Sequence, residues 1–564
     1  MRGSVMTLLL MLLTAPLLAA APAARDSMRE RFRTFMHDQE ALIAPLQKDA
    51  ALAYWEAATT GKDEAYQKQA ELQTRLETVF TDSKAFAFLK EARASGAITD
   101  PLEKRQLDSL YLAYLGRQLD PQVLARIIAK QSEVEKKFNT FRARLDGKEI
   151  TDNEIEEVLK SSTDRARRKS CYLASKQVGV VVAADVVVLA KLRNEAARKL
   201  GFRDFYAMQL ALNEQDEAWL LNLWDELDRL TVEPFGASKS RIDAVLAARL
   251  GIKPNEMMPY DYSNRFFQEA PNLTTQDFDK PLAGRDIAKD VARFYRGIGL
   301  DAEPILARSD LFERPGKYPH AFCTDIDRQG DVRALLNIQP TQSWLDTSLH
   351  ELGHGVYSYN VRRDLPYFLR GEAHIFTTEA VAMMFGRLAE NARFFQTMGY
   401  IDEATATAWA PSMDEKLRSQ ELIFSRWCQV MLRFEKGLYA NPDQDLDALW
   451  WGLVEKYQGL KRPADVPKGS WASKIHLASV PVYYHNYQLG ALFASQLEAA
   501  LSAQVLGGKP YEPAAIVGNP KVGAFFREKV FAPGASLPWQ EFVKQATGQD
   551  LSPKAFAARF VNTK

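Results

Sequence analysis

The chain has 564 residues, of which 46% are hydrophobic and 26% charged, and its 72 basic and 72 acidic side chains give a formal net charge of zero. Such a chain can bury a large core, and its balanced charge predicts neither a nucleic-acid partner nor an anionic membrane surface. The three cysteines, Cys171, Cys323 and Cys428, are odd in number and far apart, which excludes a disulfide framework and allows at most one bridge.

Residues 1–23 read as a secretory signal peptide. They contain one arginine, an apolar run from Val5 to about Leu18, and the small residues Ala21-Pro22-Ala23, which is the pattern of a cleavable signal. No later segment offers about 18 uncharged apolar residues, the minimum for a membrane-spanning helix. We therefore expect a periplasmic or secreted protein with no membrane span.

The remaining residues, 24–564, are expected to form a single domain, because no linker poor in apolar residues interrupts them. From Asp26 to about Leu250, apolar residues recur at three- and four-residue steps, which predicts helices. The run at 178–192 is rich in valine and could be taken for a strand. Its length and its continuation into 193–202 favour a helix.

The pattern changes between about 305 and 340, where proline and glycine separate two short runs around Arg328-Gln329-Gly330-Asp331. This spacing predicts a β-hairpin. Helical periodicity resumes near Trp344 and continues almost to the end of the chain. It is interrupted by a predicted loop at 461–471.

Six of the seven histidines lie between 320 and 485, which indicates a functional site in that segment. In TSLHELGHGVYS (347–358), His350 and His354 are four residues apart and share one face of a helix, so both imidazoles can reach one ion. Glu351 lies beside that face, where its carboxylate can accept a proton from an attacking water. Gly353 is expected to keep the space near the ion open. Two chance histidines on an amphipathic helix are the alternative, but HExxH is a specific pattern.

A catalytic zinc normally takes three protein ligands, and the candidates for the third are Glu372, His374 and Glu379. A second helix is expected to begin near Thr377 and to place Glu379 in its first turn, so Glu379 is the predicted ligand. A solvated glutamate is the alternative. For His374 we expect a structural or substrate-edge role.

The stretch SKIHLASVPVYYHNYQLG (473–490) concentrates lysine, histidine and tyrosine. Tyr484 and Tyr487 are three residues apart, so on a helix they point the same way. A phenol or an imidazole directed at a developing oxyanion is what a zinc peptidase needs besides its metal. Core packing is the alternative for an isolated tyrosine-rich stretch.

These residues resemble the angiotensin-converting-enzyme family of gluzincin dipeptidyl carboxypeptidases. The resemblance extends beyond HELGH to segments between about 190 and 500. They are KLRNEAARKLGF (191–202), YPHAF (318–322), LPYFLRGEAHIFTTEAV (365–381), WWGLVEKYQGL (450–460) and SKIHLASVPVYYHNY (473–487). WWGLVEKYQGL is the most specific, because no general zinc-peptidase argument requires it.

The resemblance implies a mostly α fold, with two helical lobes around a deep central cleft and a short β-hairpin or small sheet beside the active site. Residues 24–120 would supply an N-terminal helical lid, and 305–500 the active-site segment. One zinc ion per chain would be bound by His350, His354 and Glu379.

The resemblance also implies roles around that ion. Glu351 would be the general base, and His476 and Tyr487 would stabilise the tetrahedral intermediate. Lys474 and Tyr484 would hold the C-terminal carboxylate of the substrate.

His320 and Ala321 would pair with the backbone of an extended substrate as an edge strand. The expected substrates are short peptides, from which C-terminal dipeptides would be released, and the expected state is a monomer.

The sequence departs from the family at several positions. Met383 stands where the family has an aspartate that orients a zinc histidine, so another group must do so. Asn486 replaces a chloride-binding arginine, which removes the basis for chloride activation. The glutamine of the carboxylate clamp has no assigned position in DYSNRFFQEAPN (261–272), and the cysteines of a family disulfide are missing.

Two alternatives stay open. HELGH with a glutamate 25 residues after its second histidine and a YxxYxxG segment also resembles the thimet and oligoendopeptidase F family, which cleaves peptides internally. A zinc-containing protein that binds peptides without hydrolysing them is the second alternative, although binding alone would not require Glu351 and the paired tyrosines.

Overall fold

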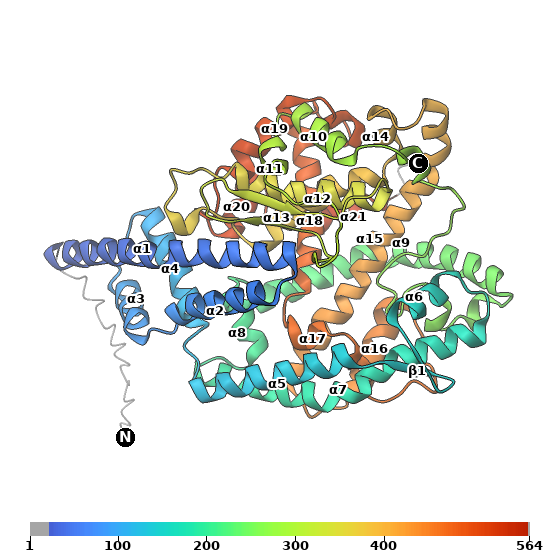
Figure 1. The fold of residues 1–564 in the computed structure, drawn as a ribbon, viewed down its shortest axis with the longest axis horizontal. Helices are drawn as coiled ribbons and strands as arrows, with labels where there is room; N and C mark the ends of the chain where they lie inside the picture. The colour runs from blue at the N-terminus through green and yellow to red at the C-terminus, as the bar shows by residue number, and fades with distance from the viewer. Residues whose placement is uncertain (1–21, 562–564) are drawn as a thin grey trace, which may run out of the picture.

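Helices make up nearly all of the regular structure in the computed structural model, which describes residues 22–561 (Figure 1). The α-helices of the first half are α1 (Pro22–Thr60), α2 (Asp63–Val79), α3 (Ser83–Ser95), α4 (Pro101–Leu115), α5 (Pro121–Thr140), α6 (Asp152–Ser161), α7 (Arg165–Lys199), α8 (Phe205–Leu212) and α9 (Glu217–Leu250). Those of the second half are α10 (Ile287–Gly297), α11 (Glu303–Leu306), α12 (Gln342–Tyr359), α13 (Ile375–Gly386), α14 (Ala392–Thr397), α15 (Glu403–Ala440), α16 (Leu446–Gln458), α17 (His476–Ser479), α18 (His485–Gln504), α19 (Pro520–Phe525), α20 (Trp539–Thr547) and α21 (Lys554–Ala558). The predicted mostly α fold is confirmed.

Two short antiparallel hairpins are the only sheets in the described residues. The first pairs β1 (Ala143–Leu145) with β2 (Lys148–Ile150), and the second pairs β3 (Phe322–Asp325) with β4 (Val332–Leu335). The second is the hairpin predicted between 305 and 340. Its turn places Arg328 at a φ of 54°.

The valine-rich run at 178–192 lies inside α7, so the prediction of a helix is confirmed. α7 is also long and apolar enough to cross a membrane by length and composition alone, but half of its most apolar window is buried inside the protein. It packs along α5 (Figure 1) and supplies buried residues such as Val182, Val186 and Leu189 to the main core. A core helix accounts for this composition.

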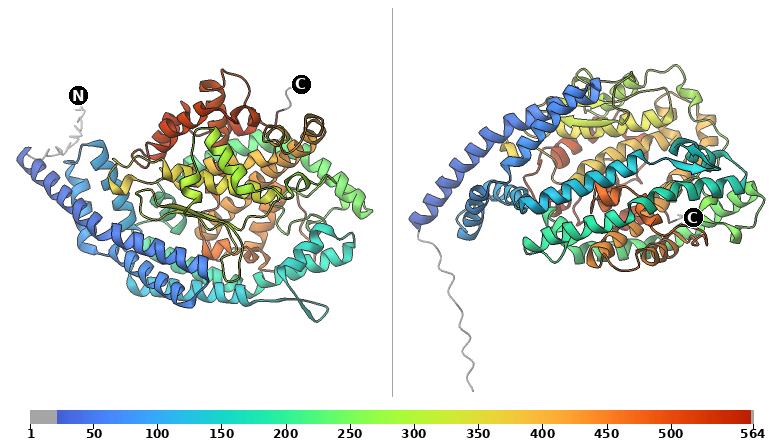
Figure 2. Two further views of the ribbon diagram at one scale, coloured as in Figure 1. Left: turned by 45° about the horizontal axis from the view of Figure 1, so that its top comes forward. Right: turned by 60° about the horizontal axis from the view of Figure 1, so that its bottom comes forward.

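The main hydrophobic core joins residues from Val134 to Phe560. A second, smaller core between Met28 and Tyr114 belongs to α1, α3 and α4. These helices form the blue flank in Figure 2, where α1 runs along one side of the molecule. The division into one domain with lid helices at 24–120 stays a prediction, and the signal-peptide prediction falls almost wholly on residues 1–21, outside the described part.

The helices α12, α13 and α18 lie in contact at the centre of the molecule (Figure 1). α12 faces the core with Leu345, Leu349, Leu352 and Val356, the spacing of one buried helix face. Glycine allows the closest approach to α13: a Cβ atom on Gly353 would lie 2.8 Å from the Cα of Ala382. The expectation that Gly353 keeps space near an ion open is therefore wrong, because its role is helix packing.

Gly353→Ala should lower the free energy of unfolding by about 1–3 kcal/mol, because backbone atoms of α13 must move to accept the methyl group. Gly452→Ala is the matched control. That helical glycine in α16 has nothing within 4 Å of its Cβ position, so alanine should be neutral or stabilising by up to about 1 kcal/mol. Urea unfolding followed by circular dichroism measures both, and equal stabilities would contradict this packing role.

Candidate metal centre and substrate cavity

The structure brings the three predicted metal ligands together. The Nε2 atoms of His350 and His354 lie 3.8 Å and 4.0 Å from Oε2 of Glu379, and one ligand atom from each residue lies within 4.8 Å of the others. In a tetrahedral zinc site with bonds of about 2.0–2.1 Å, such atoms are about 3.4 Å apart. Small side-chain rotations would therefore close the cluster around one ion.

Burial sets the protonation of this cluster. It lowers the pKa of His350 to about 4 and, with a contribution from His350, that of His354 to about 3. Both imidazoles are therefore neutral at pH 7, the form that binds a metal. Burial also raises the pKa of Glu379 to about 7, and a divalent cation would reverse that shift. Two neutral imidazoles and one carboxylate are a donor set of catalytic zinc.

Thr378 is a functional candidate that the sequence alone did not reveal. Its Oγ1 lies 2.7 Å from Nδ1 of His354. An Nδ1–H that donates to this hydroxyl leaves Nε2 free for an ion and fixes the plane of the ring. Thr378 can thus orient the ring of His354, a role for which Met383 has no suitable group. The only signal in the sequence was its position directly before Glu379.

The helix that carries Glu379 begins at Ile375 and not near Thr377, so Glu379 lies in the second turn and the predicted boundary is wrong by two residues. His374 is the N-cap, and its side chain accepts a hydrogen bond from the backbone N–H of Phe376. This contact satisfies a donor that the helix leaves unpaired. The expected structural role of His374 therefore fits the geometry.

Glu351 is buried beside the cluster. Burial, and then the neighbouring Glu379, raises its pKa to about 8, while a hydrogen bond from the backbone N–H of Cys323 opposes the shift. A carboxylate with a pKa near the working pH suits a general base. It shares a cavity of about 470 Å³ with His350, His354 and β3.

His320 and Ala321 directly precede β3. Ala321 lines the cavity of the metal ligands, whereas the exposed ring of His320 packs against Tyr318, with ring centroids 5.4 Å apart. Neither residue has a backbone hydrogen bond within the described part of the chain. Their backbone groups are therefore free to pair with an extended peptide.

The predicted oxyanion groups come from α18 and the segment before it. Gly490 lets α18 approach α13: a Cβ there would lie 3.2 Å from Cβ of Glu379. Tyr487, one turn earlier, has its pKa raised by burial and by Glu379. His476 lies next to Tyr484, with ring centroids 5.2 Å apart, and its buried Nδ1 has no partner among the described residues. Burial lowers the pKa of His476 to about 4.

Lys474 and Tyr484 form a cluster with Gln268, a glutamine of the segment 261–272. Nζ of Lys474 donates to Oε1 of Gln268 at 2.9 Å, and the hydroxyl of Tyr484 donates to the same oxygen at 3.4 Å. Gln268 is the glutamine of the segment 261–272 that the sequence left unassigned. Burial, and then Arg265, lowers the pKa of Lys474 to about 8. A carboxylate bound here would stabilise the ammonium form.

The motif WWGLVEKYQGL supports the loop that carries Gln268. The side-chain amide of Gln458 donates to the carbonyls of Phe266 and Phe267, at 3.0 Å and 2.8 Å. Phe267 has a φ of 48°, an unusual conformation for a bulky residue that surrounding contacts must hold. Trp450 packs edge-on against Trp427, which in turn contacts the ring of Tyr484.

The long helix α1 passes over the cavity beside β3. Gln47 lines the cavity and accepts a hydrogen bond from the hydroxyl of Tyr367 at 2.9 Å. Tyr54 and Trp55 pack on Phe322 of β3. A lid role for the first helices is consistent with this position.

At the expected chloride position, Oδ1 of Asn486 accepts a hydrogen bond from Nε2 of Gln215. Oε1 of Gln215 lies 2.7 Å from Nε2 of His485. These contacts are between uncharged groups. The three cysteines are all unpaired, in agreement with the absence of a disulfide framework.

Comparison with known proteins shows which families the chain resembles. A family model described as "Angiotensin-converting enzyme" matches residues 27–233, and one described as "Peptidase family M3" matches residues 305–562. Angiotensin-converting enzyme of Rattus norvegicus is 24% identical over 90% of this chain and 39% of its own length, and that of Mus musculus is 23% identical over 91% and 40%. The mouse angiotensin-converting enzyme-like protein Ace3 is 21% identical over 66% of the chain and 54% of its own length.

One matched family is described as a peptidase family and the other as angiotensin-converting enzyme, and His350, His354 and Glu379 could hold a metal ion, so the chain is similar to zinc metallopeptidases of the gluzincin type. Within that class, the chain is similar to the angiotensin-converting-enzyme family along most of its length, so the resemblance seen in the sequence is confirmed. The chain spans about two fifths of the length of the first curated relatives that it matches.

Thr378→Val should weaken zinc binding about 10- to 100-fold, because it removes the partner that orients His354. Thr378→Ser keeps the hydroxyl and should stay close to the unsubstituted protein. Titration with a chromophoric zinc chelator measures the affinity. Unchanged affinity in the valine variant would rule out the assigned role of Thr378.

Proposed function

We propose that the protein hydrolyses short peptides with a zinc ion and releases C-terminal dipeptides. The observation that carries the proposal is the cluster of Lys474, Tyr484 and Gln268 next to the metal centre. Tyr484 at this cluster and Tyr487 near Glu379 have ring centroids 5.4 Å apart. The tyrosine pair therefore links the carboxylate cluster to the side of α13 that carries Glu379.

The ion would be held by His350, His354 and Glu379, and when bound it supplies a Lewis acid that polarises the substrate carbonyl and acidifies water. Glu351 accepts a proton from the attacking water as the water oxygen bonds to the carbonyl carbon. As the C–N bond breaks, Glu351 passes that proton to the leaving nitrogen.

The other residues bind and orient the substrate. Tyr487 and His476 donate hydrogen bonds to the developing oxyanion. The Lys474 ammonium pairs with the C-terminal carboxylate, whose desolvated position makes the charge-assisted contact strong. His320 and Ala321 offer backbone groups to the extended chain.

Internal cleavage is the second candidate, because the "Peptidase family M3" model covers the residues of the metal centre. The carboxylate cluster favours dipeptide release, since an endopeptidase needs no group for a free C-terminus. A protein that only binds peptides would have no use for Glu351 beside the ligands.

We propose further that activity is independent of chloride, since Asn486, Gln215 and His485 make only uncharged contacts. Export by the segment 1–23 and a periplasmic or secreted location, with the protein acting as a monomer, complete the proposal.

The test compares one peptide with a free C-terminus and its C-terminal amide, with products identified by mass spectrometry. We expect dipeptide release from the free acid and at least about tenfold lower kcat/KM for the amide, from the loss of a charged hydrogen bond. Lys474→Met should remove most of that difference by raising KM for the free acid.

Glu351→Gln is the control for the site: it should retain zinc and lose activity by at least about 10²-fold. Internal cleavage of both peptides at equal rates would favour the endopeptidase, and zinc-loaded protein that cleaves neither would favour the binding protein.

A further inference from the structure

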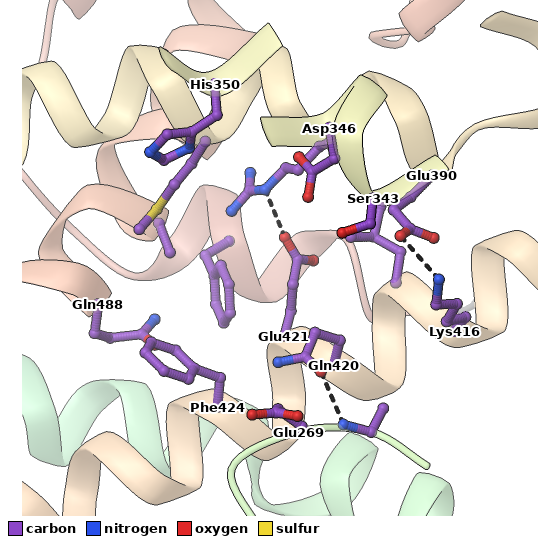
Figure 3. A pocket seen from close by; sticks show the side chains of 16 residues that line it. Glu269, Ser343, Asp346, His350, Glu390, Lys416, Gln420, Glu421, Phe424 and Gln488 are labelled. Carbon is purple, nitrogen blue, oxygen red and sulfur yellow. Dashed lines mark hydrogen bonds and ion pairs between the residues drawn. The ribbon is translucent and has the colours of Figure 1, made fainter. Parts of the chain in front are cut away.

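A second cavity, of about 610 Å³, adjoins the metal centre (Figure 3). It lies between α12, α13, α15 and α18, and the loop after Gln268 closes one side with Glu269 and Ala270. His350 lines both this cavity and the one beside β3. His350 therefore borders both cavities.

The cavity also meets the carboxylate cluster. Phe424, one of its lining residues, packs against the ring of Tyr484 with centroids 6.0 Å apart. Ala270 is two residues beyond Gln268, and its N–H donates to Gln420 at 2.8 Å. A peptide whose C-terminal carboxylate is held by Lys474 and Gln268 thus has its last side chain beside this cavity.

The two cations in the cavity are already paired. Arg387 contacts Glu421 at 2.8 Å and Glu498 at 3.4 Å, and Lys416 contacts Glu390 at 2.9 Å. Figure 3 shows the Lys416–Glu390 pair as a dashed line. Their charges are therefore largely neutralised.

The carboxylate of Asp346 has no partner. It lines the cavity from α12, four residues before His350, and makes no hydrogen bond or ion pair within residues 22–561. Gly386 leaves room for it, since a Cβ there would lie 2.4 Å from its Oδ1. Burial, and then Glu390, raises the pKa of Asp346 to about 7, while Lys416 opposes the shift.

Glu269 adds a second acidic group at the mouth, with only a 3.5 Å contact from the Gln268 amide. Neither Asp346 nor Glu269 has a cation within ion-pair distance, and both cations among the described lining residues are paired with glutamates. Lys416 and Lys474 act on the two carboxylates only from farther away. A lysine or arginine side chain of the substrate could form an ion pair with Asp346. An aliphatic side chain would leave Asp346 unpaired, and a glutamate would be repelled.

We propose that this cavity receives the side chain of the substrate's C-terminal residue and that Asp346 makes it select lysine or arginine. The inference rests on the proposed function, because it takes the C-terminal carboxylate to be held by Lys474, Tyr484 and Gln268. It adds a substrate preference that the carboxylate cluster alone does not set.

Three peptides that differ only in a C-terminal lysine, leucine or glutamate test the inference through kcat/KM for dipeptide release. We expect the lysine peptide to exceed the leucine peptide by at least about tenfold, the worth of one charge-assisted hydrogen bond, with glutamate lowest. Asp346→Asn, which keeps the shape of the side chain, should bring the lysine-to-leucine ratio to within about threefold.

Because each ratio is internal to one variant, a general loss of activity does not imitate the effect. Asp414→Asn is the matched control: Asp414 belongs to α15 but lines a different cavity, so the ratio should persist. Calorimetry adds a readout without turnover, in which Glu351→Gln protein should bind a lysine-terminated dipeptide more tightly than a leucine-terminated one.

The failures are distinguishable. Dipeptide release at equal rates from all three peptides, or a ratio unchanged by Asp346→Asn, overturns the assignment of Asp346 and leaves the proposed function intact. Absence of dipeptides from every peptide overturns both.

Discussion

The site depends on the close contact of α12, α13 and α18. Gly353 brings α12 against the backbone of Ala382, and Gly490 brings α18 against Glu379. Because these glycines have no side chain, two imidazoles from α12 and a carboxylate from α13 can converge within 4.8 Å, and α18 can bring Tyr487 near Glu379. Burial keeps the histidines neutral and disfavours an ionised Glu379. The cluster thus has no positive charge to balance an ionised Glu379, and a divalent cation would supply it.

A second constraint is the support of the loop that carries Gln268. Gln458 and Lys176 hold its carbonyls at Phe266, Phe267 and Arg265. These contacts stabilise the unusual backbone of Phe267 and keep Gln268 next to Lys474. The segment WWGLVEKYQGL is therefore explained by geometry: it lies outside the metal cluster, but it positions one wall of the substrate cavity.

Much of this could be predicted from the sequence. The helices, the hairpin after residue 305 and the HELGH helix follow from local periodicity and turn residues, and Glu379 follows from the ligand number of zinc. Contacts between segments far apart in the sequence could not be predicted in this way. Thr378 and Asp346 carry no motif, and their roles appear only once α12 and α13 are packed. The packing role of Gly353 is not visible in the sequence, because its nearest neighbour, Ala382, belongs to another helix.

The resemblance named most of the substrate residues but could not place Gln268, since its loop has no regular structure and its position is fixed by residues about 190 positions away. The same limit applies to the aspartate that Met383 replaces: the sequence showed that a partner was missing, and only the packed structure shows the hydroxyl near His354.

The most direct test of the account is anomalous diffraction at the zinc edge from crystals of the zinc-loaded protein. The account predicts one peak per chain, at about 2.0–2.2 Å from Nε2 of His350, Nε2 of His354 and a carboxylate oxygen of Glu379. A peak elsewhere, or a peak at the two histidines with Glu379 turned away, would contradict it.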